Sequence, residues 1–517
     1  MRIHLRALCA LGVFLLVLGS AQAAGAQDLT IKIAQGKLQG KSINGGRVHA
    51  FLGIPYAAPP VGELRWRPPE PAARWRGTRN ATRYGARCMQ GHPYSDMIFQ
   101  DSGPSEDCLY LNVFAPAGAN SKSKLPVMFW IHGGGFLAGS ASEPRHNGDF
   151  LPTKGLVLVT INYRLGVFGF LATPPLAAEQ SGAAGNYGLL DMVAALQWVH
   201  ANIAAFGGDP ANVTIFGESA GSESVSILMA AQPARGLFAR AIGESGGGLD
   251  VGGPAKPSFH EVERRDQAWV NSLGMDLKHL RELPADVILS TATRPDAPHF
   301  RPVVDGRLLT EPVAVTYAQG KQAHVPLLAG WNRDEQSGLG NGMTAEKWRA
   351  FAQLKYPEHV AEVLQVYPAN NDAQAVRSAI DYDSDTFIAF GTWRWVDAQT
   401  KTGDAPVYRY HFELPAPPSK FHPGWRTFHS DDIEYVFGTL DTRPEAEWRP
   451  EDRELSNQMM DYWTNFARRG NPNAAGLPEW PCFDRTHEIL HLANPIAAGQ
   501  DTTEDKYQFL LKWKPKK

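Results

Sequence analysis

The segment Val213-Thr214-Ile215-Phe216-Gly217-Glu218-Ser219-Ala220-Gly221 carries the strongest local signal in the sequence. A short apolar run typical of a buried strand leads into Gly-x-Ser-x-Gly, and a helical stretch follows as far as Met229. The two flanking glycines permit a turn so tight that side chains in their place would collide with neighbouring strands. The segment therefore predicts a nucleophile elbow, which presents the hydroxyl of Ser219 at the start of a helix.

A second signal is the stretch Trp130-Ile131-His132-Gly133-Gly134-Gly135-Phe136, in which an apolar strand ends in three consecutive glycines. Such a run destabilises the fold, so we expect it only where backbone without side chains is needed. An oxyanion hole needs it, because its N–H groups must approach a developing negative charge to about 3 Å. A flexible loop is the alternative interpretation. We interpret the similar run at residues 246–248 as a loop, since no partner signal accompanies it.

A serine nucleophile needs a base, and the base needs an acid that holds its tautomer. The 16 histidines of the chain compete for the first role. In α/β-hydrolases the order is Ser, then Asp or Glu, then His, each after a strand. Asp334 and Glu335 follow the apolar run 325–329, and His429 follows the run 407–412 at a distance. Spacing alone leaves Asp334 and Glu335 both open as the acid.

Short apolar runs alternate with helical stretches along the chain, which indicates a mostly parallel sheet covered by helices on both sides. We expect strands at residues 125–131, 156–163, 213–216, 238–244, 325–329 and 407–412. Residues 189–205 place Val193, Leu196, Val199 and Ile203 on one helical face. Residues 346–400 are helical in pattern and rich in aromatics, and we expect them to form an insertion over the C-terminal edge of the sheet.

The composition, 43% hydrophobic and 20% charged over 517 residues, is that of a folded globular chain. A net charge of −3 provides no overall field that would attract nucleic acid or an anionic membrane. Length alone suggests about three domains. No Pro/Gly/Ser linker or internal repeat marks a boundary, however, so we expect residues 24–517 to form a single domain.

The first 23 residues predict a cleaved signal peptide. Arg2 and Arg6 precede an apolar run at residues 7–18, and Ala21-Gln22-Ala23 follows as a small-x-small cleavage site, with Ala24-Gly25-Ala26 as a second possible site. A membrane anchor is the alternative, but the run is shorter than the roughly 20 residues that a spanning helix needs. We therefore expect an exported protein, periplasmic or secreted, without stable membrane insertion.

Four cysteines cannot form a disulfide-rich scaffold. Cys9 would leave with the signal peptide, so Cys88, Cys108 and Cys482 remain in an oxidising compartment. A bridge between Cys88 and Cys108 would close one local loop and contribute about 3 kcal/mol. Cys482 would then be left over as a buried free thiol. No cysteine, histidine or carboxylate motif has the spacing of a metal site, and we expect neither metal nor cofactor.

Further stretches resemble the type-B carboxylesterases, the family that includes para-nitrobenzyl esterases and cholinesterases, and the likeness covers nearly the whole mature chain. The stretches are Phe51-Leu52-Gly53-Ile54-Pro55-Tyr56, Leu64-Arg65-Trp66, Ser105-Glu106-Asp107-Cys108-Leu109-Tyr110-Leu111-Asn112, Asn162-Tyr163-Arg164, Phe206-Gly207-Gly208-Asp209-Pro210 and the elbow itself.

The resemblance implies an α/β-hydrolase fold and a serine esterase; with the predicted signal peptide, we expect it to be secreted. It implies a catalytic triad of Ser219, Glu335 and His429, and so favours Glu335 over Asp334. It also implies oxyanion-hole N–H groups from Gly134, Gly135 and Ala220, and a bridge between Cys88 and Cys108. His132 is expected to be structural, because the family tolerates other residues there.

The substrate is expected to be a small-molecule ester, but its acyl and alcohol groups are open, as is the oligomeric state. Phe136, Trp425 and Arg426 are candidate pocket residues, and Arg426 could meet an acidic group of the substrate or form a surface salt bridge. Residues 89–107 lack the Trp by which cholinesterases hold choline, which makes choline esters poor candidates. The alternatives are a catalytically silent binding or adhesion relative, and an esterase specialised for polycarboxylate or toxin esters.

Overall fold

The structure is a computed structural model that describes residues 29–251, 253, 256–420, 424 and 426–516. The predicted signal peptide at residues 1–23 and the candidate pocket residue Trp425 lie outside the described residues.

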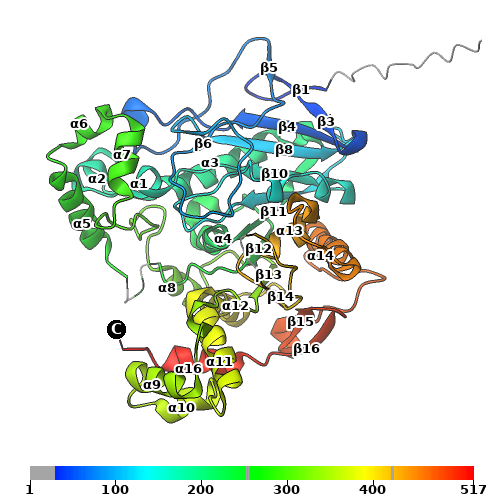
Figure 1. Cartoon of the computed structure of the whole chain (residues 1–517). Coiled ribbons are helices and arrows are strands. Elements are labelled where there is room, and N and C mark those ends of the chain that lie inside the picture. Colours follow the sequence, from blue (N-terminus) through cyan, green and yellow to red (C-terminus); the bar gives the residue numbers. More distant parts are fainter. Residues whose placement is uncertain (1–28, 252, 254–255, 421–423, 425, 517) are drawn as a thin grey trace, which may run out of the picture.

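A twisted sheet of eleven strands runs through the middle of the molecule (Figure 1). Its spatial order is β16-β15-β14-β13-β12-β11-β9-β10-β8-β4-β3. The seven strands from β15 to β10 are parallel, and the strands at both ends are antiparallel. The bounds are β3 (Lys41–Ile43), β4 (Val48–Pro55), β8 (Tyr110–Pro116), β9 (Leu125–Ile131), β10 (Val157–Ile161), β11 (Gly208–Glu218), β12 (Arg240–Glu244), β13 (Leu327–Asn332), β14 (Val407–Phe412), β15 (Glu488–Leu492) and β16 (Ala497–Gln500).

Helices cover both faces of this sheet (Figure 1), so the predicted fold class is confirmed. They are α1 (Gly166–Phe170), α2 (Pro174–Glu179), α3 (Tyr187–Asn202), α4 (Ala220–Ala230), α5 (Phe259–Ser272), α6 (Leu277–Glu282), α7 (Ala285–Ala292), α8 (Val313–Ala318), α9 (Ala345–Lys355), α10 (Val360–Val366), α11 (Asp372–Ser384), α12 (Phe390–Thr402), α13 (Ile433–Phe437), α14 (Pro450–Arg469), α15 (Phe483–Thr486) and α16 (Glu504–Lys512).

Alternate residues of β9 pack into two separate cores, as the two-residue period of a strand requires. Val127, Phe129 and Ile131 join the core under α3, α4 and α12, whereas Met128 and Trp130 join the core under α13 and α14. All five side chains are inaccessible to solvent. A strand buried on both faces is continuously apolar, which explains why the run 125–131 could be recognised in the sequence.

The predicted strands at 125–131 and 407–412 have the observed bounds of β9 and β14. The predicted strand at 213–216 is longer in the structure, because β11 starts at Gly208 with a register shift against β9 before Val213. That extension contains Asp209, Pro210 and Asn212, residue types that are depleted in strands. For this reason the pattern of apolar runs did not predict that the strand begins at Gly208.

The stretch Tyr187–Phe206, which comprises α3 and the 3₁₀ turn after it, is long and apolar enough to cross a membrane by length and composition. Most of it is buried against the sheet, with Leu189, Met192, Leu196 and Val199 in the core. Packing therefore accounts for its apolar character.

The helical segment predicted at residues 346–400 corresponds to α9 to α12. Helices α9 to α11 join α16 in a group beyond the sheet at the bottom of Figure 1, and α12 packs both on this group and on the sheet. This group has an aromatic core of its own, which includes Trp348, Tyr367, Tyr382 and Trp393. Between α11 and α12 the chain forms a short π-helix, Asp385–Ala389. That segment reaches the site described below.

Cys88 and Cys108 form a disulfide, as the resemblance implied. Cys482 is a free thiol, half-buried rather than buried, and its Sγ donates a hydrogen bond to Asp484 Oδ1 at 2.7 Å. Burial and the neighbouring carboxylate raise the pKa of Cys482 to about 11, so the sulfur stays protonated at neutral pH.

Candidate active site

Ser219 lies between β11 and α4 in a backbone conformation that residues with side chains rarely adopt, with φ 55° and ψ −121°. A Cβ atom on Gly217 would lie 2.5 Å from the carbonyl oxygen of Ile131, and one on Gly221 would lie 2.0 Å from the same atom. Both glycines are therefore required for the turn to pack against β9, as the sequence predicts. The hydroxyl of Ser219 then stands at the N-terminus of α4.

Three side chains from three loops meet at this turn. His429 follows β14, and its Nε2 lies 2.9 Å from Ser219 Oγ. Its other nitrogen, Nδ1, lies 2.6 Å from Oε2 of Glu335, which follows β13. The hydroxyl, the imidazole and the carboxylate thus form one continuous hydrogen-bond chain, although 210 residues separate Ser219 from His429.

Glu335 is held by further hydrogen bonds. Its Oε1 accepts from the backbone N–H of Asn332 at 2.7 Å and from Ser245 Oγ at 2.5 Å. The neighbouring Asp334 points elsewhere and pairs with Arg377 at 2.6 Å. The geometry therefore separates the two acids that spacing left open. Ser245 and Asn332 were not singled out from the sequence, although both stand at the ends of predicted strands, where site residues gather.

The glycine run beside the elbow lies directly against it. A Cβ on Gly133 would lie 2.5 Å from Glu218 Oε2 and 3.0 Å from the Ser219 Cβ, and one on Gly134 would lie 2.1 Å from the carbonyl of Ala138. No described residue accepts a hydrogen bond from the amides of Gly134, Gly135 or Ala220. Three unpaired N–H groups near a serine hydroxyl are what an oxyanion hole requires.

His132 supports this run from behind. Its ring stacks on Tyr163 with centroids 4.4 Å apart, and Tyr163 donates a hydrogen bond to the His132 carbonyl at 2.8 Å. Burial lowers the pKa of His132 to about 4, so the ring is neutral at pH 7. These contacts fit the structural role expected for His132.

The glycines at residues 246–248 form a loop, as predicted, and they also allow close packing that the sequence did not predict. A Cβ on Gly246 would lie 2.3 Å from the Ser219 carbonyl, and one on Gly247 would lie 2.4 Å from the carbonyl of Gly391. This loop therefore packs α12 closely against the elbow.

Glu218, the variable residue of the elbow motif, is buried beside the imidazole. Its Oε1 lies 3.2 Å from His429 Nε2 and has no hydrogen-bond partner in the described part of the chain. Burial raises the pKa of Glu218 to about 8. Burial by itself would lower the pKa of His429, but Glu218 and Glu335 outweigh it and raise that pKa above its ordinary value of 6.5.

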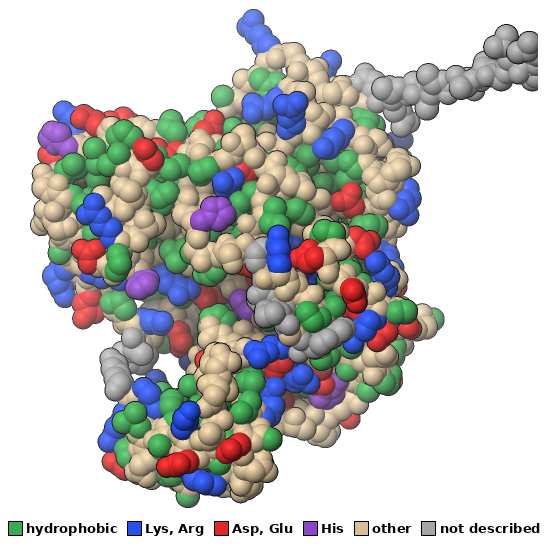
Figure 2. Space-filling model, in the orientation of Figure 1, with side chains coloured by type: hydrophobic (Ala, Val, Ile, Leu, Met, Phe, Trp, Pro, Cys, Tyr) green, Lys and Arg blue, Asp and Glu red, His purple; other side chains and the backbone are tan. Residues whose placement is uncertain are grey.

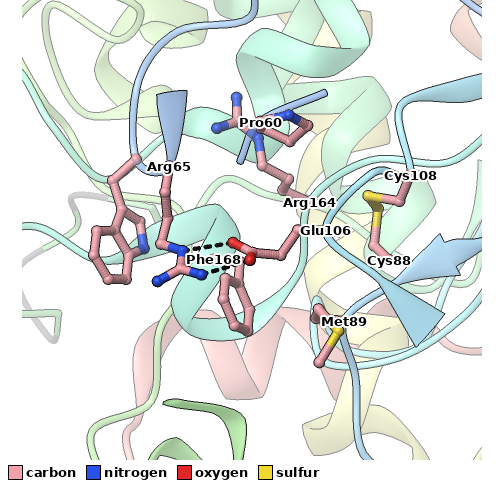
Figure 3. A pocket seen from close by; sticks show the side chains of 9 residues that line it. Pro60, Arg65, Cys88, Met89, Glu106, Cys108, Arg164 and Phe168 are labelled. Carbon is pink, nitrogen blue, oxygen red and sulfur yellow. Dashed lines mark hydrogen bonds and ion pairs between the residues drawn. A yellow bond between two sulfur atoms is a disulfide. The ribbon is translucent and has the colours of Figure 1, made fainter. Parts of the chain in front are cut away.

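The disulfide-closed loop between Cys88 and Cys108 covers the glycines. The hydroxyl of Tyr94 would lie 2.9 Å from a Cβ on Gly135. The loop is anchored by Glu106, which forms a buried ion pair with Arg65 at 2.5 Å beside the disulfide (Figure 3). Two separate family stretches of the sequence, those with Arg65 and Glu106, therefore meet to hold this loop over the site.

A cavity of about 410 Å³ lies next to the hydrogen-bond chain. Phe387, from the π-helix, lines it and packs its ring edge-to-face on His429 with centroids 5.0 Å apart. Glu223, one turn after Ser219, lines it as well. On the face shown in Figure 2, the surface is hollowed between the lower helical group and the main body, and charges of both signs are intermixed.

The other candidate pocket residues have different surroundings. Phe136 is fully buried, and the guanidinium of Arg301, which lines the cavity, lies 5.5 Å from the centroid of its ring. Arg426 is half-buried and donates a hydrogen bond to Ser337, and no described carboxylate forms an ion pair with it. A contact between Arg426 and an acidic substrate stays a prediction.

Comparison with known proteins adds an independent finding. The model of the carboxylesterase family matches residues 27–510. The chain is 35% identical over 483 residues to a fumonisin B1 esterase of Sphingopyxis macrogoltabida, covering 88% of this chain and 85% of the relative. It is 35% identical over 501 residues to para-nitrobenzyl esterase of Bacillus subtilis, covering 92% and 97%. It is 34% identical over 530 residues to carboxylesterase 1D of Rattus norvegicus, covering 93% and 92%.

The charges around His429 predict how the reactivity of Ser219 depends on pH. Only the neutral imidazole can accept the hydroxyl proton, so the rate of phosphonylation of Ser219 should fall as the pH drops through the His429 pKa. Because carboxylates raise that pKa, the midpoint should lie above 6.5. Glu218→Gln should move the midpoint to lower pH, since it removes the carboxyl that, when ionised, stabilises a protonated His429 from a distance of 3.2 Å.

The measurement is the pH dependence of covalent labelling by a phosphonate. Glu454→Gln, which removes an exposed carboxylate from α14, is the matched control and should leave the midpoint in place. An identical midpoint in Glu218→Gln and the unmodified protein would contradict the assignment.

Proposed function

The chain belongs to the carboxylesterase family and is a carboxylic ester hydrolase, and we propose that it acts through an acyl-enzyme with Ser219 as nucleophile. His429 is the general base and Glu335 is the acid of the triad. The observation that carries this proposal is the unbroken hydrogen-bond chain from Ser219 Oγ through both nitrogens of His429 to Glu335 Oε2.

In the first step His429 Nε2 accepts the proton of Ser219 as Oγ attacks the ester carbonyl. Glu335 stabilises the resulting imidazolium through its hydrogen bond with Nδ1. The imidazolium then gives its proton to the departing alcohol, which leaves an acyl group on Ser219. A water molecule, deprotonated by the same imidazole, releases the acid and restores the serine.

In this proposal, the backbone N–H groups of Gly134, Gly135 and Ala220 stabilise the negative oxygen of the tetrahedral intermediate by donating hydrogen bonds to it. Backbone donors suit this task because they are fixed before the reaction begins, so no reorganisation is needed as charge develops. The loss of one such donor typically costs about 3–4 kcal/mol of transition-state stabilisation. The N-terminus of α4 adds a favourable partial positive charge at the same place.

A catalytically silent binding relative is the competing function. The paired triad geometry and the unpaired oxyanion amides support the enzyme, because a binding protein has no use for a strained serine that costs roughly 1–3 kcal/mol.

Ser219→Ala separates the two functions. The variant removes the nucleophile without removing the pocket, so kcat for a p-nitrophenyl ester should fall by at least about three orders of magnitude while the Tm stays close to that of the unmodified protein. Mass spectrometry after phosphonate treatment should find the label on Ser219 in the unmodified protein and no label in the variant. Comparable turnover by Ser219→Ala would contradict the mechanism.

We further propose that the enzyme is exported and loses residues 1–23. The charged start, the apolar run and the small residues at the cleavage site support export, and so does the Cys88–Cys108 disulfide, because disulfides persist in oxidising compartments.

Export is tested by expressing the full chain in a bacterial host and measuring the mass of the protein outside the cytoplasm. The mature protein should begin at Ala24. Leu15→Arg, which interrupts the apolar run, should hold the full-length chain in the cytoplasm. Active protein that keeps Met1 in the exported fraction would contradict cleavage.

A preference for esters that carry an acidic group is a second proposal, and the cavity beside His429 supports it. Four basic side chains line it, those of Lys256, Arg265, His299 and Arg301, against the two carboxylates of Glu223 and Asp250. Both carboxylates are engaged, with Arg301 at 3.5 Å and with Arg394, respectively. Arg265 is engaged as well, with Asp266 at 2.8 Å. No described carboxylate forms an ion pair with Lys256, which leaves this cation for a substrate acid group.

The test compares p-nitrophenyl butyrate with the mono-p-nitrophenyl ester of succinic acid. Lys256→Gln should raise KM for the acidic ester by about tenfold, the worth of one charge-assisted hydrogen bond, and leave the neutral ester almost unchanged. Lys401→Gln on the exposed side of α12 is the matched control. Fumonisin B1 is a third substrate to compare, because a relative is named as a fumonisin B1 esterase. Equal effects on both esters would contradict the preference.

A further inference from the structure

Two histidines on neighbouring strands meet near the edge of the sheet, away from the catalytic serine. Strands β14 and β15 are parallel, and their register places His411 directly opposite His491. Side chains of directly paired residues lie on the same face of a sheet. The two imidazoles therefore come together although 80 residues separate them in sequence.

A carboxylate completes the group. Oε1 of Glu413 lies 2.8 Å from His411 Nδ1 and 2.6 Å from His491 Nδ1. The backbone N–H of Glu413 donates to the carbonyl of Leu492 at 2.9 Å, which fixes this residue beside the end of β15. One ligand atom from each of the three residues lies within 4.8 Å of the others.

We propose that His411, Glu413 and His491 bind a divalent transition-metal ion of the Zn²⁺ class. Two imidazoles and a carboxylate are a ligand set that Zn²⁺ uses with an open fourth position for water. The carboxylate also neutralises part of the charge of the ion. The three side chains are between 12% and 25% exposed, so an ion can reach them from solvent.

The distances suit this occupant after a small adjustment. Ligands bound to one ion at about 2.0–2.1 Å with tetrahedral angles stand about 3.3 Å apart, roughly half an ångström or more beyond the nitrogen–oxygen distances here. Glu413 can supply that movement, because its side chain is partly exposed at the start of the segment that follows β14.

Both rings are oriented by protein contacts that leave Nδ1 facing the carboxylate. The ring of His411 packs edge-to-face on Trp331, with centroids 6.2 Å apart. The Nε2 of His491 faces β16, 3.1 Å from the position of a Cβ on Gly499. Rings held in this way lose little freedom when they bind an ion, which favours affinity.

An ion at this place would join β14 to β15 where the chain leaves the sheet toward His429. It would stabilise the fold, because an ion that binds the folded state and not the unfolded chain raises the unfolding temperature. The alternative is a group without a metal, in which the Nδ1–H groups of both imidazoles donate hydrogen bonds to the same oxygen of Glu413.

The experiment uses the full mature protein, purified without a histidine tag and stripped with a chelator. Calorimetric titration with Zn²⁺ should show one site per chain, and Zn²⁺ should raise the Tm, whereas Mg²⁺, which prefers oxygen ligands, should not. Glu413→Gln and His491→Gln should each weaken Zn²⁺ binding by at least about tenfold and abolish the rise in Tm.

His260→Gln is the matched control, because it removes an exposed histidine that is paired with a single carboxylate, that of Glu263, and it should bind Zn²⁺ like the unmodified protein. Co²⁺ in place of Zn²⁺ gives a visible spectrum that reports imidazole ligands even in a variant of lowered stability. The proposal would be overturned if the protein bound no Zn²⁺ at a one-to-one ratio, or if Zn²⁺ binding survived Glu413→Gln and His491→Gln. The three side chains would then form a hydrogen-bonded group without a metal.

Discussion

The backbone of Ser219, held in a strained turn against β9, is the constraint on which the site depends. Two glycines pass so close to the Ile131 carbonyl that neither position could carry a Cβ atom. The turn stays in this conformation because β11 is buried between β9 and β12 in the middle of the sheet. A rigid, fully buried support is what allows a strained residue to persist and keeps its hydroxyl in one position.

The partners of Ser219 come to it because parallel strands end at the same edge of a sheet. His429 follows β14 and Glu335 follows β13, so the sheet brings together three residues that are far apart in the chain. The same edge also collects buried carboxyls. Glu218, Glu244 and Asp432 each have a pKa raised mainly by burial, so burial favours the neutral form of the carboxyls that surround the imidazole.

The surroundings of the site come from segments outside the central strands. The disulfide-closed loop covers the glycine run beside Ser219, and the buried Arg65–Glu106 pair anchors it (Figure 3). The π-helix places Phe387 on His429 and forms one wall of the cavity. Since loops and insertions vary more among related proteins than the sheet they surround, we expect these segments to decide substrate preference.

The sequence by itself determined the elements with strong local signals. The elbow, the glycine run, the strands at 125–131 and 407–412 and the fold class could all be predicted, because each depends on periodicity or on a short motif. Spacing left Asp334 and Glu335 open and only the family resemblance favoured Glu335, whereas the tertiary structure shows which acid faces His429. It alone shows where Glu218 points and that His411 meets His491. These contacts join residues that are distant in the chain, or depend on the direction of one side chain, and no local pattern encodes either property.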